Sequence, residues 1–354
     1  MLSSHPKSKV LAVLPKGGAA AKQPDYLVCQ ENALDLRDWL EKQGAEYVVT
    51  ADKEGENSEF ERHLPDADIV ITTPFHPAYL KPEQLQKAGK LKLVITAGIG
   101  SDHIDLNAAA EKGEVTVAEV TGSNVVSVAE DELMRVLLLV RNFVPGYEQS
   151  RGGEWDVPQL AQKARDLEGL TVGTVGGGRI ATLLMKRLKG FDCTRFYFDK
   201  QERQPMTDEG VEFREDLDSM LAECDVVVIN TPLTDKTRGM FDKERLSKMK
   251  KGAHLVNNAR APIVEIESIV EALESGQLGG YSGDVWYPQP APKDHPWRKA
   301  PNCYMTPHIS GTTLQAQKRI AEGVREMLEQ WFQGEPFRED YYIVREGELA
   351  EQYQ

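Results

Sequence analysis

A glycine-rich turn between a buried strand and an amphipathic helix constrains this chain more than any other feature. The turn lies in the run LTVGTVGGGRIATLLMKRL, which spans Leu170 to Leu188. It has the form G-x-G-x-x-A, in which the first glycine permits a tight turn and the second lets the backbone approach a phosphate. The free N–H groups of the following helix can then bind a pyrophosphate. Gly176, Gly178 and Ala181 take the three motif positions, so the run predicts dinucleotide binding.

An acidic residue closes the next strand, about 20 residues further on. Asp199 ends the string FYFD, where it can accept hydrogen bonds from the ribose hydroxyls of NAD. Its charge would repel the 2′-phosphate of NADP, although the neighbouring Lys200 leaves room for some NADP use. The alternative is a solvated aspartate at a strand end. Strand, turn, helix and aspartate together favour NAD as the cofactor.

The rest of the chain alternates short β-like runs with helical patterns, which is typical of parallel sheets with crossover helices. Nearly all of these runs lack apolar and polar alternation, so we expect strands that are buried on both faces. The sequence therefore predicts the α/β class, with two Rossmann-like, doubly wound parallel-sheet domains. The expected strands lie in KVLAVLP, DIVITTP, LKLVITAG, LTVGTVGGG, TRFYFD, DVVVINTP, GAHLVNN, GYSGDVW and CYMTPH.

Two long helical patterns, at about 124–143 and 313–332, mark the connections between the domains. We expect Ser123 or Asn124 to cap the first helix. A nearly complete nucleotide-binding pattern lies between the two helices. We therefore expect an NAD-binding domain at 124–308, inserted into a substrate domain made of 1–123 plus 309–354.

Composition limits the partners of this chain. Its 354 residues suffice for two domains, and its net charge of -14 argues against nucleic acids and anionic membranes, which select basic faces. No apolar run approaches the ~20 residues of a membrane span. The four cysteines form no CxxC pair, which favours free thiols in a reducing compartment over disulfides or a metal site. A small-molecule ligand and no metal are expected.

The N-terminal residues lead almost at once into the first expected strand, which leaves no room for a signal or transit peptide. We therefore expect a cytoplasmic protein. A mitochondrial location is the alternative if a presequence was removed ahead of this numbering.

Several longer strings resemble the NAD-dependent formate dehydrogenases of the D-2-hydroxyacid dehydrogenase superfamily, above all their plant-like branch. The resemblance covers almost the whole chain. It implies an oxidoreductase of one-carbon metabolism that oxidises formate to carbon dioxide by hydride transfer to NAD, and it implies a homodimer that forms through the helix at about 124–143. The strings are TTPFHPAY at 72–79, TAGIGSDHIDL at 96–106, EVTGSNVVSVAEDELMR at 119–135, GDVWYPQPAPKDHPWR at 283–298 and MTPHISGTT at 305–313.

The resemblance assigns the formate pocket to residues in the first half of the chain and to one arginine. Phe75, Ile99 and Asn124 correspond to pocket-lining residues of related enzymes, and Arg260 corresponds to the residue that binds the substrate carboxylate. Each has another reading. Phe75 and Ile99 could be core residues, Asn124 could only cap its helix, and Arg260 could form a surface ion pair.

An amide takes the place where the wider superfamily has a carboxylate. In those enzymes a glutamate about 29 residues after the arginine supports the catalytic histidine; here Gln289 follows Arg260 by 29 residues, and the histidine is His308. Formate is already an anion with no hydroxyl proton to lose, so no general base is needed. Gln289 can orient His308 without adding negative charge near an anionic substrate. The resemblance thus gives Arg260, His308, Gln289 and Asn124 as catalytic residues, although His308 could instead be an ordinary buried histidine.

Two alternatives to this function remain open. An NAD-dependent D-2-hydroxyacid dehydrogenase is disfavoured by Gln289 and by the bulk of Phe75 and Ile99. A non-catalytic NAD-sensing regulator is disfavoured because Arg260 and His308 are both present. The residues that the resemblance assigns to NAD are Gly176, Gly178, Arg179, Ile180, Asp199, Pro232, Asn258, Arg260, Asp284, His308, Ser310 and Gly311.

One departure from the family pattern concerns the backbone beside Arg260. Ala261 and Pro262 stand where the relatives have Gly-Ala. If that glycine adopts positive φ, Ala261 would be strained, so a disturbed setting of Arg260 is expected.

Overall fold

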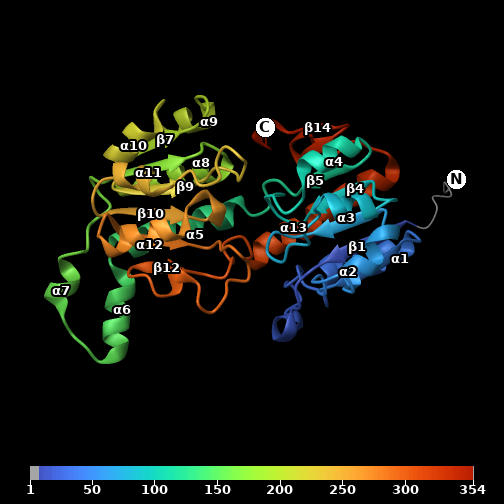
Figure 1. The fold of residues 1–354 in the computed structure, drawn as a ribbon, viewed down its shortest axis with the longest axis horizontal. Coiled ribbons are helices and arrows are strands. Elements are labelled where there is room, and N and C mark those ends of the chain that lie inside the picture. Colours follow the sequence, from blue (N-terminus) through green and yellow to red (C-terminus); the bar gives the residue numbers. More distant parts are fainter. Residues whose placement is uncertain (1–7, 354) are drawn as a thin grey trace. The chain divides into compact units, whose positions relative to one another are not determined.

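The computed structural model describes residues 8–353 and divides into two compact units. Unit 1 comprises Met1–Asn124 and Gly311–Gln354, and unit 2 comprises Val125–Ser310. Figure 1 shows the course of the chain through both units. Within residues 8–353, no helix combines the length and apolarity needed to cross a membrane.

Unit 1 is built on a sheet with the strand order β14-β13-β5-β4-β3-β1-β2. The strands from β1 to β5 are parallel, and β13 runs antiparallel to both β5 and β14. The order reverses between β1 and β3, which is a topological switch point. The strands are β1 Lys9–Val13, β2 Glu46–Thr50, β3 Ile69–Thr72, β4 Leu93–Thr96, β5 Thr116–Glu119, β13 Tyr342–Arg345 and β14 Glu348–Leu349.

The long helix α13, Leu314–Gln333, packs closely on the sheet of unit 1. The Thr313 hydroxyl caps it by accepting from the Ala316 amide, and Gly334 ends it at φ +70°. Gly323 allows the close approach, because a Cβ there would lie 2.2 Å from Cγ1 of Val120. The other helices of unit 1 are α1 Arg37–Lys42, α2 Glu59–His63, α3 Pro82–Lys87 and α4 Leu106–Lys112.

Unit 2 contains a parallel sheet with the order β12-β11-β10-β9-β6-β7-β8. The chain moves from β6 to β7 and β8 on one side and then crosses to β9 on the other. The switch point therefore lies between β6 and β9, where sheets of this kind bind ligands. The strands are β6 Thr171–Val175, β7 Thr194–Phe198, β8 Glu212–Phe213, β9 Val226–Ile229, β10 Ala253–Asn257, β11 Leu278–Gly283 and β12 Cys303–Met305.

The helix α5, Val125–Val140, packs in the core of unit 2, where Ala129 and Val136 share an apolar cluster with α8. It ends three residues before the expected position 143, because Asn142 takes a left-handed conformation at φ +51° and a new helix, α6, follows. In Figure 1, α6 and α7 project from the rest of unit 2. The helices of unit 2 that follow α5 are α6 Phe143–Gly152, α7 Val157–Ala161, α8 Arg179–Leu188, α9 Gln204–Asp208, α10 Leu217–Glu223, α11 Lys243–Lys248 and α12 Ile266–Glu274.

All nine expected strands are present, as β1, β3, β4, β6, β7 and β9 to β12. The prediction of burial on both faces is wrong for two of them. β12 is half-buried because it is an edge strand, and β7 is partly exposed because its outer neighbour β8 has only two residues. Short 3-10 helices cover Gly18–Lys22, Ala33–Asp35, Leu64–Asp66, Lys189–Phe191, Ala261–Ile263, Pro296–Arg298, Glu339–Tyr341 and Glu351–Tyr353.

The close approach of α13 to β5 gives a stability prediction. Gly323→Ala should destabilise the protein by about 1–3 kcal/mol, because the new methyl group would overlap Val120. The matched control is Gly146→Ala in α6, where the nearest atom to a new Cβ lies at 3.8 Å. There the helix gains about 0.5–1 kcal/mol from alanine. Urea unfolding at one protein concentration measures both, and equal stability of the two variants would contradict this packing.

Candidate active site

The turn after β6 has the geometry of a phosphate-binding loop. Gly176 lies at φ +103°, and a Cβ there would come within 2.5 Å of the Asn230 carbonyl oxygen, so only glycine fits. Gly178 is exposed and precedes α8, with nothing within 4 Å of the place that its Cβ would take. Arg179 and Ile180 form the first turn of that helix. The N-terminus of α8 is therefore open to a pyrophosphate.

Asp199 lies beside this turn, directly after β7. Its Oδ2 atom accepts a hydrogen bond of 3.0 Å from the Gly177 amide. This hydrogen bond places the carboxylate, which would bind the ribose, beside the turn, which would bind the phosphates. A dinucleotide site needs these two groups side by side. The residues present fit a bound NAD.

Two more of the predicted NAD residues follow strands β9 and β10. Pro232 is exposed, and its carbonyl oxygen accepts from the Thr237 hydroxyl at 2.7 Å. Asn258 is buried, and its Nδ2 donates to Asp131 at 2.7 Å. The Oδ1 atom of Asn258 has no hydrogen-bond partner among the described residues. A buried polar atom of this kind suits a ligand donor.

Arg260 follows β10 in an extended conformation, with φ -146° and ψ 138°. Its carbonyl oxygen accepts from the Asn257 side chain at 3.0 Å. The expected strain at Ala261 is wrong, because Ala261 is not among the residues with positive φ and instead begins a short 3-10 helix that contains Pro262. The departure from the family pattern leaves the backbone beside Arg260 unstrained.

The structure brings His308 and Gln289 together within unit 2. Nδ1 of His308 lies 2.9 Å from Oε1 of Gln289, so the ring nitrogen donates to a neutral amide oxygen. His308 itself has a left-handed backbone with φ +59°. The peptide bonds before Pro288 and Pro290 are cis.

A buried carboxylate fixes the turn that carries His308. Asp284, directly after β11, accepts the backbone amides of Ile309 at 2.8 Å and of Ser310 at 2.7 Å, and also the Thr306 hydroxyl. Hydrogen bonds to an ionised acceptor are the stronger kind. These hydrogen bonds hold His308 in its left-handed backbone conformation, which costs free energy in a residue other than glycine.

Sequence reasoning missed the arginine behind this turn. Arg135 of α5 is buried and donates to the Gly283 carbonyl oxygen at 2.7 Å and to the Thr306 hydroxyl. It also pairs with Asp131 and lies 3.7 Å from Asp284. The signal was available, because Asp131 and Arg135 are four residues apart on the same helix, the spacing at which an acid and a base can pair.

Glu132, also on α5, was missed as well. It is fully buried, and burial raises its pKa to about 8. One oxygen accepts from Asn230 Nδ2 at 3.3 Å, whereas Oε1 has no partner among residues 8–353. Because the carbonyl oxygen of Asn230 abuts Gly176, Glu132 supports the phosphate-binding turn from behind.

The predicted formate residues of unit 1 lie after three adjacent strands. Phe75 follows β3, Ile99 follows β4 and Asn124 follows β5. A Cβ on Gly311 would lie 2.6 Å from Asn124 Nδ2 and 3.3 Å from Phe75 Cζ, so these three residues are neighbours. Phe75 also packs against the core of unit 1, and Ile99 is half-buried.

Asn124 does not act as a helix cap through its oxygen. The side chain is buried, and Oδ1 has no hydrogen-bond partner in the described part of the chain. Ser123 donates its hydroxyl to the Val120 carbonyl oxygen. Nearby, burial lowers the pKa of His76, whose Nε2 lies 3.0 Å from the Ala51 carbonyl oxygen. The amide of Asn124 is therefore an available polar group at this end of the sheet.

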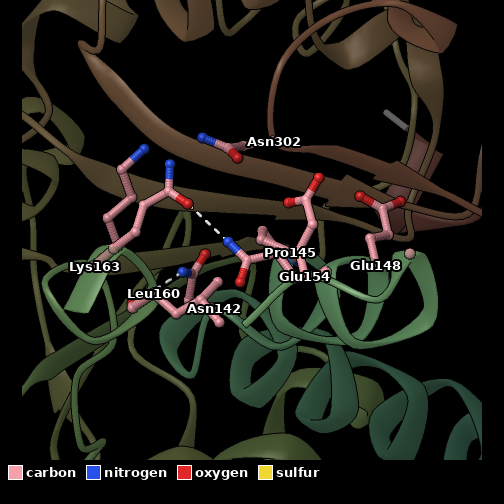
Figure 2. A pocket seen from close by; sticks show the side chains of 10 residues that line it. Asn142, Pro145, Glu148, Glu154, Leu160, Lys163 and Asn302 are labelled. Atoms are coloured by element: carbon pink, nitrogen blue, oxygen red, sulfur yellow. Dashed lines mark hydrogen bonds between the residues drawn. The ribbon is translucent and has the colours of Figure 1, made fainter. Parts of the chain in front are cut away.

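A cavity of about 390 Å³ lies away from all of these residues, on the side of unit 2 that carries α6 and α7. Figure 2 shows its lining, which includes Glu148, Glu154, Lys163 and Asn302. None of the predicted site residues contributes to it. The cavity is a feature of the projecting segment and is separate from the predicted chemistry.

Known proteins resemble the chain over nearly its full length. Residues 133–310 match the family described as D-isomer specific 2-hydroxyacid dehydrogenase, NAD binding domain. A formate dehydrogenase of Arabidopsis thaliana, named chloroplastic/mitochondrial, is 59% identical over 99% of this chain and 92% of its own. Two solved structures are each 45% identical. A Granulicella formate dehydrogenase has a TM-score of 0.92 and covers 97% of this chain and 100% of its own. A Staphylococcus aureus NAD-dependent formate dehydrogenase in complex with NAD has a TM-score of 0.87 and covers 95% of this chain and 99% of its own.

The anchoring of the His308 turn can be tested by Asp284→Asn. One acceptor oxygen is lost and an NH₂ group faces a backbone donor, so the amides of Ile309 and Ser310 should exchange with solvent about tenfold faster or more. Hydrogen exchange of peptides that cover 305–312 measures this. Asp242→Asn is the control, because asparagine also caps α11 well. Unchanged exchange in 305–312 would show that the carboxylate does not hold the turn.

Proposed function

The chain belongs to the formate dehydrogenases, within the D-isomer specific 2-hydroxyacid dehydrogenases, and on that basis we propose that it oxidises formate to carbon dioxide with NAD. The observation that carries the proposal is the amide oxygen of Gln289 at 2.9 Å from Nδ1 of His308. An enzyme that removes a hydroxyl proton from its substrate gains from a carboxylate at that position, which would stabilise the charged histidine.

Formate needs no such base. The reaction breaks the C–H bond of the formate anion, moves its electron pair with the hydrogen as a hydride, and leaves carbon dioxide, so no proton is transferred. NAD, when bound, supplies the nicotinamide ring that accepts the hydride. The protein contributes positioning and electrostatic stabilisation.

We assign the residues of the chain to three tasks. Arg260 binds the carboxylate oxygens as a cation with several donors, and Asn124 offers an amide to the same anion. Phe75 and Ile99 restrict the pocket to a small substrate. Gln289 orients His308 and adds no negative charge. The residues proposed to hold NAD are Gly176, Gly178, Arg179, Ile180, Asp199, Pro232, Asn258, Arg260, Asp284, His308, Ser310 and Gly311.

The two compact units carry different parts of this function in our proposal. Residues 124–308 form the NAD-binding domain, and residues 1–123 plus 309–354 form the substrate domain. The glycine turn and Asp199 in unit 2 support the first assignment. The positions of Phe75 and Ile99, after β3 and β4 in unit 1, support the second.

The deciding experiment mixes the purified protein with NAD and formate and follows the absorbance of NADH. Formation of NADH that depends on formate supports the proposal. Oxidation of NADH with glyoxylate or hydroxypyruvate, with none formed from formate, would favour a D-2-hydroxyacid dehydrogenase. NAD binding without turnover of any of these substrates would favour an NAD-sensing regulator.

The neutral amide beside His308 gives the sharpest prediction. Gln289→Glu should weaken formate binding at neutral pH, because a second negative charge then lies near an anionic substrate. The new carboxylate also favours protonated His308. kcat/KM for formate should therefore fall with rising pH as His308 loses its proton, whereas the parent stays flat.

The measurement compares kcat/KM for formate from mildly acidic to alkaline pH. Gln43→Glu, at an exposed position after α1, adds the same charge away from His308 and should leave the profile flat. Superimposable profiles of Gln289→Glu and the parent would mean that Gln289 does not act on His308.

We further propose a homodimer that uses α5 and the projecting segment of α6 and α7. Several large apolar side chains are exposed there, among them Met134, Phe143, Tyr147 and Trp155, and Trp155 is 86% exposed. The rings of Phe143 and Tyr147 stack with their centroids 6.3 Å apart, and exposed apolar side chains that lie together mark a protein interface. Light scattering should give a dimer for the parent and a monomer for Trp155→Glu combined with Met134→Glu. Tyr79→Glu in unit 1 is the control, and a parent that is monomeric at all concentrations would refute the interface.

We propose a reducing compartment, the cytoplasm or the mitochondrion. All four cysteines are free thiols, and burial raises the pKa of Cys224 and of Cys303 to about 12, which keeps both protonated. Fractionation of the source cells with an antibody against this chain tests the location. Recovery from an oxidising compartment would contradict it.

A further inference from the structure

The carboxylate of Asp199 is fully engaged by donors from the protein. Its Oδ1 accepts from the Lys200 amide at 2.6 Å, and its Oδ2 accepts from the Gly177 amide at 3.0 Å. The guanidinium of Arg203 adds Nε at 3.1 Å from Oδ2 and Nη2 at 3.4 Å from Oδ1. A carboxylate offers about four lone-pair sites, so ribose hydroxyls must replace a donor that is already there.

Arg203 is the donor that can leave. The amides of Gly177 and Lys200 belong to the phosphate-binding turn and to the end of β7, where the backbone is fixed. The side chain of Arg203 is long and 36% exposed, and an ion pair of this exposure is weak. The ribose of NAD can therefore displace the guanidinium at little cost.

The backbone of Arg203 stays close when its side chain moves. Its amide donates to the hydroxyl of Tyr197 at 2.8 Å, and Tyr197 is fully buried. The Cγ of Arg203 also packs on the turn, since a Cβ on Gly177 would lie 3.1 Å from it. A displaced guanidinium thus remains within reach of whatever occupies the ribose site.

We propose that Arg203 is a cofactor-specificity residue of this site: it gives way to the ribose hydroxyls of NAD, and it supplies the cation that binds a 2′-phosphate once Asp199 no longer repels that group. This inference rests on the proposed binding of NAD. The refusal of NADP then depends on the pair of residues, because Asp199 repels a phosphate that Arg203 attracts.

The test measures binding of ADP-ribose and of 2′-phospho-ADP-ribose to the full-length protein by calorimetry, so it needs no turnover. The variants are Asp199→Gln, Arg203→Gln and their combination. Asp199→Gln should bind 2′-phospho-ADP-ribose about tenfold more tightly or better than the parent, and the combination should lose most of that gain. Added salt should weaken the gain, because it comes from a charge pair.

Two controls separate Arg203 from its neighbours. Lys200→Gln, placed on Asp199→Gln, removes the adjacent cation and should keep the gain. Arg245→Gln, on the same background, breaks the equivalent pair with Asp218 at 3.0 Å and should also keep it. Arg203→Gln alone should weaken only the binding of 2′-phospho-ADP-ribose. If Arg203 had a purely structural role, its replacement would weaken the binding of both ligands.

Three results would overturn the proposal. The tighter binding of 2′-phospho-ADP-ribose by Asp199→Gln could survive when Arg203→Gln is added to it. That tighter binding could instead disappear when Lys200→Gln is added. Finally, Arg203→Gln alone could weaken the binding of both ligands equally. Failure of the parent to bind ADP-ribose at all would remove the NAD-binding function and this inference with it. Binding of ADP-ribose without formate oxidation would refute only the proposed reaction and leave the assignment of Arg203 open to the same measurement.

Discussion

The buried ion cluster around Arg135 holds together the side of unit 2 that carries His308. A guanidinium that is removed from water is costly unless its donors and its charge are matched. Arg135 meets both needs with the Gly283 carbonyl oxygen, the Thr306 hydroxyl and the carboxylate of Asp131. Gly283 ends β11 and Thr306 directly follows β12, so one side chain fixes the spacing of the strand ends from which Asp284 and the His308 turn extend. Removing it would leave the buried carboxylate of Asp284 and the half-buried carboxylate of Asp131 without their cation.

Features that are local in sequence were predictable. A continuous apolar run bounded by glycine or proline identifies a buried strand without knowledge of the neighbouring strands in the sheet. The central strands could therefore be predicted from the sequence. The run EYVVT of β2 is a partly exposed edge strand, and TVAE of β5 is short and mixed, so neither carries that signal. The break at Asn142 depends on a left-handed residue that any sequence scan reads as helical.

The candidate site divides in the same way. Gly176, Gly178 and Asp199 were predicted because their geometry is set by a few neighbouring residues. The local pair of Asp131 and Arg135 was not enough to identify the role of Arg135, because its partners Ser282 and Gly283 lie about 150 residues further along the chain. Glu132 was missed because it is recognisable only by its burial. Ala261 shows the opposite error, since a pattern borrowed from relatives predicted strain that the backbone of this chain does not have.

Burial of Glu132 has a thermodynamic consequence. Its pKa of about 8 in the folded protein exceeds the ordinary value of 4.5, so between these limits the folded state holds a proton that the unfolded chain has released. Unfolding of unit 2 therefore releases a proton at neutral pH. This carboxyl lowers stability as pH rises through that window, opposite in sign to a carboxylate in an ion pair. The support behind the phosphate-binding turn is thus coupled to the proton concentration.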